Sequence, residues 1–151
     1  MGATDRLAEL DITLPEPVRP MGSYVPATQV GSLVYCSGQT PWVKGKLLHT
    51  GKVDVEVSPE DAYAAARQSA LNALAAIDAL VGLDNIKRVI KVLGFVASDP
   101  SFTGQPAVIN GASDVLIEIF GAAGRHARSA VGMTALPGGT PVEVEIIVEV
   151  A

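Results

Sequence analysis

The chain has 151 residues and a mass of 15.6 kDa, the size of one domain that can bury about two thirds of its unfolded surface. Its net charge of −5 makes nucleic acid an unfavourable partner. The single Cys36 excludes an internal disulfide, and residues 1–10 show neither a signal peptide nor a long apolar run. These features predict a soluble cytoplasmic protein that does not enter a membrane.

Apolar residues make up 48% of the chain and charged residues only 18%, a low charged fraction for a monomer of this size. Some strand faces are therefore expected to be covered by other subunits. His49 and His126 have no cysteine or acidic residue around them at metal-ligand spacing. The sequence predicts no metal site and no cofactor.

The first twenty residues differ in character from the rest. Thr4 is a candidate N-cap for a short helix over residues 5–10. Pro15, Pro17 and Pro20 then exclude regular structure over the following stretch. We expect residues 1–20 to form an arm that covers a single α+β domain of residues 21–151.

Two strand regions are predicted next. An extended segment over residues 21–26 leads to a strand over residues 33–37, and Gly38 after it allows a ligand or another chain to come close. Residues 42–53 read as a more polar strand region with a hairpin around residues 44–46.

Helix and strand then alternate. Ser58 and Pro59 are a strong start for a helix that runs to about Val81 and stops at Gly82. Residues 86–97 form an apolar strand that has no polar face beyond its start, which predicts burial on both sides. One helical layer covers only one side, so the second cover is expected to be another subunit. A second helix is predicted from Gln105 to about residue 123.

Two strands are expected to close the chain, over residues 127–136 and 142–150, joined antiparallel by a turn at residues 137–141. The last strand alternates apolar residues with glutamates. This arrangement would put Arg128 on a strand next to Glu143 and Glu145. A buried arginine needs a partner, so Arg128 either pairs with one of these carboxylates or binds a carboxylate ligand. Two helices on one face of a mostly antiparallel sheet make an α+β fold.

A series of motifs runs through residues 20–151, at residues 22–25, 36–39, the helix segment 57–74, 95–96, Asn110, 127–129, 136–137 and 142–145. Through these motifs the chain resembles the Rid family (reactive intermediate deaminase, also called YjgF-type). The resemblance implies a chorismate-mutase-like fold and a homotrimer with a small-molecule pocket at each subunit interface. The arm and residues 101–105 depart from the short form and indicate a longer subgroup, and Ala130 stands where many members have a cysteine.

The resemblance also implies roles for residues. Arg128 would bind the substrate carboxylate, and Glu143 would orient a water molecule. The pocket residues that the resemblance implies have plainer interpretations as well. Tyr24 could be a lid over the core, the Ser37 hydroxyl could hydrogen-bond to backbone, and Asn110 could be a polar residue in a helix. Glu143 could belong to a solvated face, and Cys36 is expected to be buried and inert. The implied pocket residues are Tyr24, Ser37, Gly38 and Asn110.

Three functions follow from these residues. The first is hydrolytic deamination of small 2-imino or enamine acids to 2-keto acids and ammonia. The second is non-catalytic binding of a small carboxylate by a sensor or regulator. The third, a ribonuclease or translation inhibitor, is disfavoured by the charge of −5 and the lack of a basic stripe. Chorismate mutase chemistry would require several basic groups in one pocket.

Overall fold

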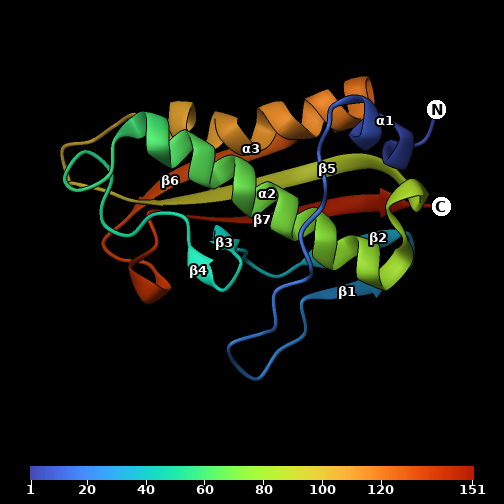
Figure 1. Cartoon of the computed structure of the whole chain (residues 1–151), viewed down its shortest axis with the longest axis horizontal. Helices are drawn as coiled ribbons and strands as arrows, with labels where there is room; N and C mark the ends of the chain where they lie inside the picture. Colours follow the sequence, from blue (N-terminus) through green and yellow to red (C-terminus); the bar gives the residue numbers. More distant parts are fainter.

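A computed structural model describes all 151 residues and shows one five-stranded sheet with two long helices packed on one face (Figure 1). The strand order is β1-β2-β7-β5-β6, and β3 and β4 form a separate two-stranded sheet. Only β5 and β6 pair in parallel. The expected α+β fold with a mostly antiparallel sheet is confirmed. Its elements are α1 (Ala3–Glu9), β1 (Ala27–Val30), β2 (Leu33–Cys36), β3 (Trp42–Val43), β4 (Lys46–Leu47), α2 (Pro59–Val81), β5 (Ile86–Ala97), α3 (Gln105–Phe120), β6 (Ala127–Met133) and β7 (Val142–Val150), with short 3₁₀ turns at Leu83–Asn85, Gly121–Gly124 and Pro137–Gly139.

The helix α2 begins and ends where the sequence predicts. The Ser58 side chain accepts a hydrogen bond from the Asp61 amide at 3.0 Å, and Gly82 ends the helix at a positive φ of 85°. The helix α3 ends at Phe120, earlier than predicted. The next four residues tighten into a 3₁₀ turn that begins at Gly121, whose φ is 60°.

Small residues let the two helices approach each other and the sheet closely. A Cβ atom added at Gly111 of α3 would overlap the carbonyl oxygen of Tyr63 in α2. One added at Gly94 of β5 would overlap the Ile109 side chain of α3. The buried face of α2 is rich in alanine for the same reason.

The two faces of β5 differ. Val92 and Val96 are fully buried under the helices. Lys91, Leu93 and Phe95 lie on the opposite face of the sheet and are only partly buried. The strand itself is confirmed over the predicted residues. Within one chain, only one of its faces is fully covered, and a second subunit over the other stays a prediction.

The predicted pairing of the last two strands is wrong. β5 lies between β6 and β7 and pairs with both, in parallel with β6 and antiparallel with β7. The connection over residues 134–141 is long enough to cross over β5, since it must span only two strand spacings of about 4.8 Å each. Alternation along a strand shows which face a residue occupies, but not which strand lies beside it.

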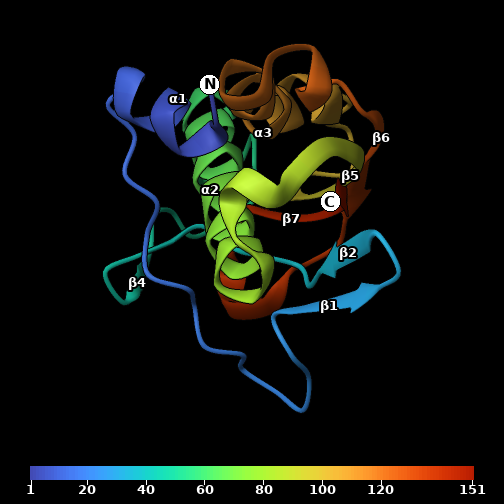
Figure 2. The same ribbon diagram turned by 90° about the vertical axis from the view of Figure 1, so that its right-hand side faces the viewer.

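The N-terminal segment lies against the helical layer (Figure 2). The helix α1 begins two residues earlier than predicted: Gly2 is the N-cap and Thr4 lies inside the helix. The Thr4 amide donates to Asp84 at 2.9 Å, and Arg6 Nε donates to the Glu118 carbonyl at 2.9 Å. Leu7 is buried in the core. These contacts fix α1 beside α3.

The hairpins near the start of the domain differ from the prediction in extent. The strand β1 was not predicted, because three of its four residues are exposed and carry no apolar pattern. The two residues Gly31 and Ser32 that join it to β2 are a hairpin signal. The hairpin at Lys44 and Gly45 is confirmed, with positive φ at both residues, but its strands have only two residues each.

One stretch, residues 105–124, is long and apolar enough to cross a membrane by length and composition alone. Half of it is buried inside the fold, where α3 packs against α2 and β5. Core helices of soluble proteins have the same property.

Gly111→Ala tests the close packing of α2 and α3. Helix propensity alone would stabilise the protein by about 1 kcal/mol. Overlap with the Tyr63 carbonyl should outweigh this, so we expect a net loss of about 1–3 kcal/mol in the free energy of unfolding. Chemical denaturation at fixed protein concentration measures the change, and a more stable variant would contradict the packing.

Candidate functional site

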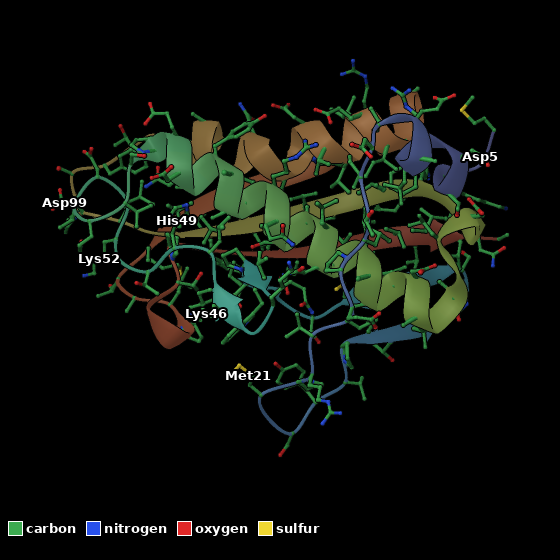
Figure 3. All side chains as sticks on the ribbon, in the orientation of Figure 1. Asp5, Met21, Lys46, His49, Lys52 and Asp99 are labelled. Atoms are coloured by element: carbon green, nitrogen blue, oxygen red, sulfur yellow. The ribbon has the colours of Figure 1, made fainter.

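A cavity of about 330 Å³ opens beside the start of β7. It is lined by Glu143, Gly38 and Tyr24, which were predicted as site residues. Residues 18–20 of the arm and the following Met21 form another part of its wall. Figure 3 shows Met21 on the loop that leads from the arm to β1, on the same side of the molecule as Lys46 of β4. The remaining lining comes from Pro26, Gln39, Thr40, Trp42, Leu47, Pro137 and Gly138.

The Glu143 carboxyl group lies against the backbone at Gly38. A Cβ atom at Gly38 would lie 2.8 Å from the Glu143 carboxyl carbon, so only glycine allows this approach. Burial, and secondarily the nearby Glu145 carboxylate, raises the pKa of Glu143 above its ordinary value. A carboxylate with a raised pKa is a better proton acceptor near neutral pH.

The wall of this cavity is fixed from α2 by an amide that the sequence interpretation missed. Asn72 is fully buried, and its Nδ2 donates to the carbonyl oxygens of Thr40 at 2.9 Å and Trp42 at 3.1 Å. Gln68 donates to its Oδ1 at 3.0 Å. The available signal was an asparagine in the middle of an alanine- and leucine-rich helix, because a buried amide needs partners.

Tyr24 and Ser37 lie near the cavity but are bound to backbone. Ser37 Oγ donates to the Val25 carbonyl at 2.6 Å. The Tyr24 hydroxyl accepts from the Met21 amide at 3.3 Å, and half of the Tyr24 residue surface is exposed. Their predicted roles in ligand binding stay predictions.

Arg128 lies elsewhere, against α3. Its Nη1 donates to Asn110 Oδ1 at 2.7 Å and to Ser113 Oγ at 3.2 Å, and its Nη2 donates to the Pro106 carbonyl at 3.3 Å. The ion pairs of the chain involve Arg6, His49, Arg67 and Arg88, and none includes Arg128. The alternative of an ion pair with Glu143 or Glu145 is therefore wrong.

The partly buried guanidinium of Arg128 keeps donors available. A guanidinium has five N–H groups. Three are used within the chain, which leaves Nε–H and one N–H of Nη2 without a partner. Two neighbouring donors of this kind match the two oxygens of a carboxylate.

Arg128 and Glu143 lie on opposite faces of the sheet. Arg128 is level with Val92, on the face under the helices, whereas Glu143 is level with Phe95, on the other face. Three residues along β5 separate these levels by about 10 Å. The predicted site residues thus form two groups within one chain, one of Tyr24, Ser37, Gly38 and Glu143 and one of Arg128 and Asn110.

The face of the sheet opposite the helices, here called the outer face, carries a second cavity of about 610 Å³. Tyr24, Tyr35, Ser37 and Lys91 contribute to it. Large apolar side chains are exposed nearby, among them Tyr35 at 42% and Val131 at 41%. No three His, Cys, Asp or Glu side chains converge anywhere in the chain, so no side-chain cluster offers a metal site.

Cys36 behaves as the sequence predicts. It is buried, and desolvation raises the pKa of its thiol to about 12, which leaves it uncharged and unreactive at neutral pH.

Known proteins match nearly the whole chain. The family described as "YjgF/chorismate_mutase-like, putative endoribonuclease" matches residues 4–149. Protein TCP17 of Trypanosoma cruzi is 42% identical over 95% of this chain and 91% of its own length. The 2-iminobutanoate/2-iminopropanoate deaminase of Dermatophagoides farinae is 33% identical over 91% of this chain and 93% of its own. The crystal structure of Atu1372 from Agrobacterium tumefaciens superposes with a TM-score of 0.91 at 46% identity, covering 99% of this chain and 92% of that one.

The raised pKa of Glu143 predicts a pH-dependent cost in stability. Between the unfolded and the raised folded pKa, the folded protein holds more protons, so the free energy of unfolding falls as pH rises. Above both pKa values the cost is complete, and below both it is absent. Glu143→Gln should therefore be more stable than the wild type at pH 7, with a difference that shrinks towards zero below pH about 4.

Denaturant unfolding at the two pH values, at one protein concentration, measures this difference. The exposed Glu16 on the arm supplies the control: Glu16→Gln should leave the stability unchanged at both pH values. Lower stability of Glu143→Gln at pH 7 would be inconsistent with a desolvated carboxylate.

Proposed function

Because the chain belongs to the YjgF/chorismate mutase-like family, we propose that it hydrolyses small 2-imino acids, and the enamines that tautomerise to them, to 2-keto acids and ammonia. The observation that carries this proposal is the guanidinium of Arg128, partly buried, unpaired with any carboxylate and left with two free donors. A deaminase of this type among the relatives supports the substrate class.

In the proposed reaction, Arg128 holds the substrate carboxylate in two hydrogen bonds. Glu143 orients a water molecule and accepts its proton as the oxygen attacks C2 of the imine. The nitrogen receives that proton, which gives the carbinolamine. Transfer of the hydroxyl proton to the nitrogen, again through Glu143, then breaks the C–N bond, releases ammonia and forms the C=O of the 2-keto acid. Imines hydrolyse without catalysis. The enzyme therefore has to supply only proximity and general acid–base catalysis, each of which accelerates the reaction by about 10²–10⁴-fold, and no cofactor is needed.

A working site needs two chains under this proposal. Arg128 and Glu143 lie on opposite faces of one sheet, and a substrate a few ångströms long cannot reach both within a chain. A homotrimer that covers the outer face would bring Glu143 of one chain to Arg128 of the next. The exposed apolar residues of that face, including Tyr35 and Val131, support such burial. We expect this trimer to act in the cytoplasm, with three times the 15.6 kDa mass of one chain.

Arg128→Ala tests the carboxylate contact. Loss of two charge-assisted hydrogen bonds should lower kcat/KM for freshly generated 2-iminobutanoate by about 10²-fold or more. Arg125→Ala, three residues earlier and exposed, is the matched control and should keep wild-type activity.

The same assay separates the competing functions. Full activity in Arg128→Ala would refute the assignment of Arg128. A wild type that binds 2-oxobutanoate but does not exceed the buffer rate would indicate a carboxylate sensor instead. RNA cleavage lost in Arg128→Ala would favour the endoribonuclease function named in the family description, despite the net charge of −5.

Mixed trimers test whether the site is shared. Arg128→Ala and Glu143→Gln chains should each be nearly inactive alone. If they are unfolded together in equal amounts and refolded, about a quarter of the sites in randomly assembled rings should combine an intact Arg128 with an intact Glu143. Activity near a quarter of wild type is expected.

The two chains carry different affinity tags, so that hybrid trimers can be isolated on both and assayed. One of the three sites in each isolated hybrid is intact, so about a third of wild-type activity is expected from them. Refolded wild type treated identically sets the reference. Inactive hybrids would mean that both residues of each site come from one chain, or that Glu143 has no part in turnover.

A further inference from the structure

We propose that His126 and Ser113 are positioning residues that set the direction in which Arg128 presents its free donors; this rests on the carboxylate-binding role of Arg128 proposed above. The three side chains form one connected line. Arg128 Nη1 donates to Ser113 Oγ at 3.2 Å, Ser113 Oγ lies 2.9 Å from His126 Nε2, and His126 Nδ1 lies 2.6 Å from the Gly124 carbonyl oxygen.

The direction of each hydrogen bond in the line follows from chemistry. A carbonyl oxygen only accepts, so Nδ1 of His126 carries the proton and donates to Gly124. In a neutral imidazole, Nε2 is then an acceptor, so the Ser113 hydroxyl donates a hydrogen bond to it. The guanidinium only donates, so Ser113 Oγ accepts from Arg128. Every donor in the line has one acceptor.

His126 thereby fixes the direction in which the Ser113 O–H bond points. A serine inside a helix otherwise tends to donate to a backbone carbonyl of the preceding turn. When the hydroxyl donates its hydrogen bond to His126 instead, the lone pairs of Ser113 Oγ face Arg128. Asn110 and Ser113 are three residues apart on α3, so both contact Nη1 and leave Nε–H and the second N–H of Nη2 free.

Local backbone structure places the histidine. His126 and Arg128 are two residues apart where the chain enters β6, so both side chains point to the α3 side of the sheet. Gly124 in the 3₁₀ turn is buried, and a Cβ there would overlap the Leu116 carbonyl oxygen of α3. This close packing sets the Gly124 carbonyl beside His126. No acidic side chain takes part in the line.

Two substitutions of His126 separate hydrogen bonding from packing. Gln places an amide oxygen near the position of Nε2 and can still accept from Ser113, whereas Phe keeps the ring volume without an acceptor. We expect His126→Phe to raise KM for 2-iminobutanoate by about tenfold with kcat within about twofold, because the carboxylate contact is the same in ground and transition states. His126→Gln should keep most of the wild-type KM.

Ser113→Ala should reproduce the effect of His126→Phe, and adding it to His126→Phe should cause little further change, because both act through one line of hydrogen bonds. If packing were the role, the order would reverse, with Phe retained and Gln impaired. That order, or a wild-type KM in both variants, would overturn the proposal.

Calorimetric dissociation constants for 2-oxobutanoate give the same ranking without turnover. A wild type that binds 2-oxobutanoate but does not speed imine hydrolysis would remove the deaminase function, while the ranking of variants still decides the role of His126. A wild type that binds no 2-oxobutanoate would overturn both.

Discussion

In the sheet, β5 lies between β7 and β6, and its two faces meet different surroundings. The β5 face under α2 and α3 is fully buried. A residue on a neighbouring strand that is paired with a residue of this face also points towards the helices. Arg128 on β6 is such a residue and must find its partners on α3. Glu143 on β7 belongs to the other face. The separation of the two groups thus follows from strand order, and the need for a second chain follows from the separation.

Neither Glu143 nor Arg128 has a partner of opposite charge within the chain. Glu143 lies against the backbone at Gly38, and the loop beside it is bound by the buried amide of Asn72. Arg128 is bound by an amide oxygen, a hydroxyl and a carbonyl. Partners without charge orient an ionic group but do not neutralise it. Each half therefore remains available for a charge of opposite sign or for a proton.

The small residues around the site allow close packing of the helical layer. Gly111 and Gly124 let α2, α3 and the 3₁₀ turn lie in contact, which brings the polar side of α3 up to the edge strand β6. An ordinary side chain at either position would move α3 outward and lengthen the hydrogen bonds to Arg128. The packing of the helical layer therefore also determines the orientation of the Arg128 guanidinium.

The sequence by itself determined the elements with strong local signals. The cap at Ser58, the stop at Gly82 and the apolar run of β5 gave α2 and β5 their observed bounds, because capping and periodicity depend on neighbours along the chain. Alternation also assigned Glu143 and Glu145 correctly to the less buried face of β7. The exposed β1, the early end of α3 and the start of α1 carried weaker signals and were missed or misplaced.

Only the tertiary structure decided which strands are neighbours and which side chains meet. Periodicity contains no information about the strand alongside, so the sequence placed Arg128 next to Glu143, whereas β5 lies between them. The arm residues around the cavity, the Asn72 contacts and the line from Arg128 to His126 join segments far apart in sequence or on different elements. Such contacts form because the whole core packs in one way, and no local pattern encodes them.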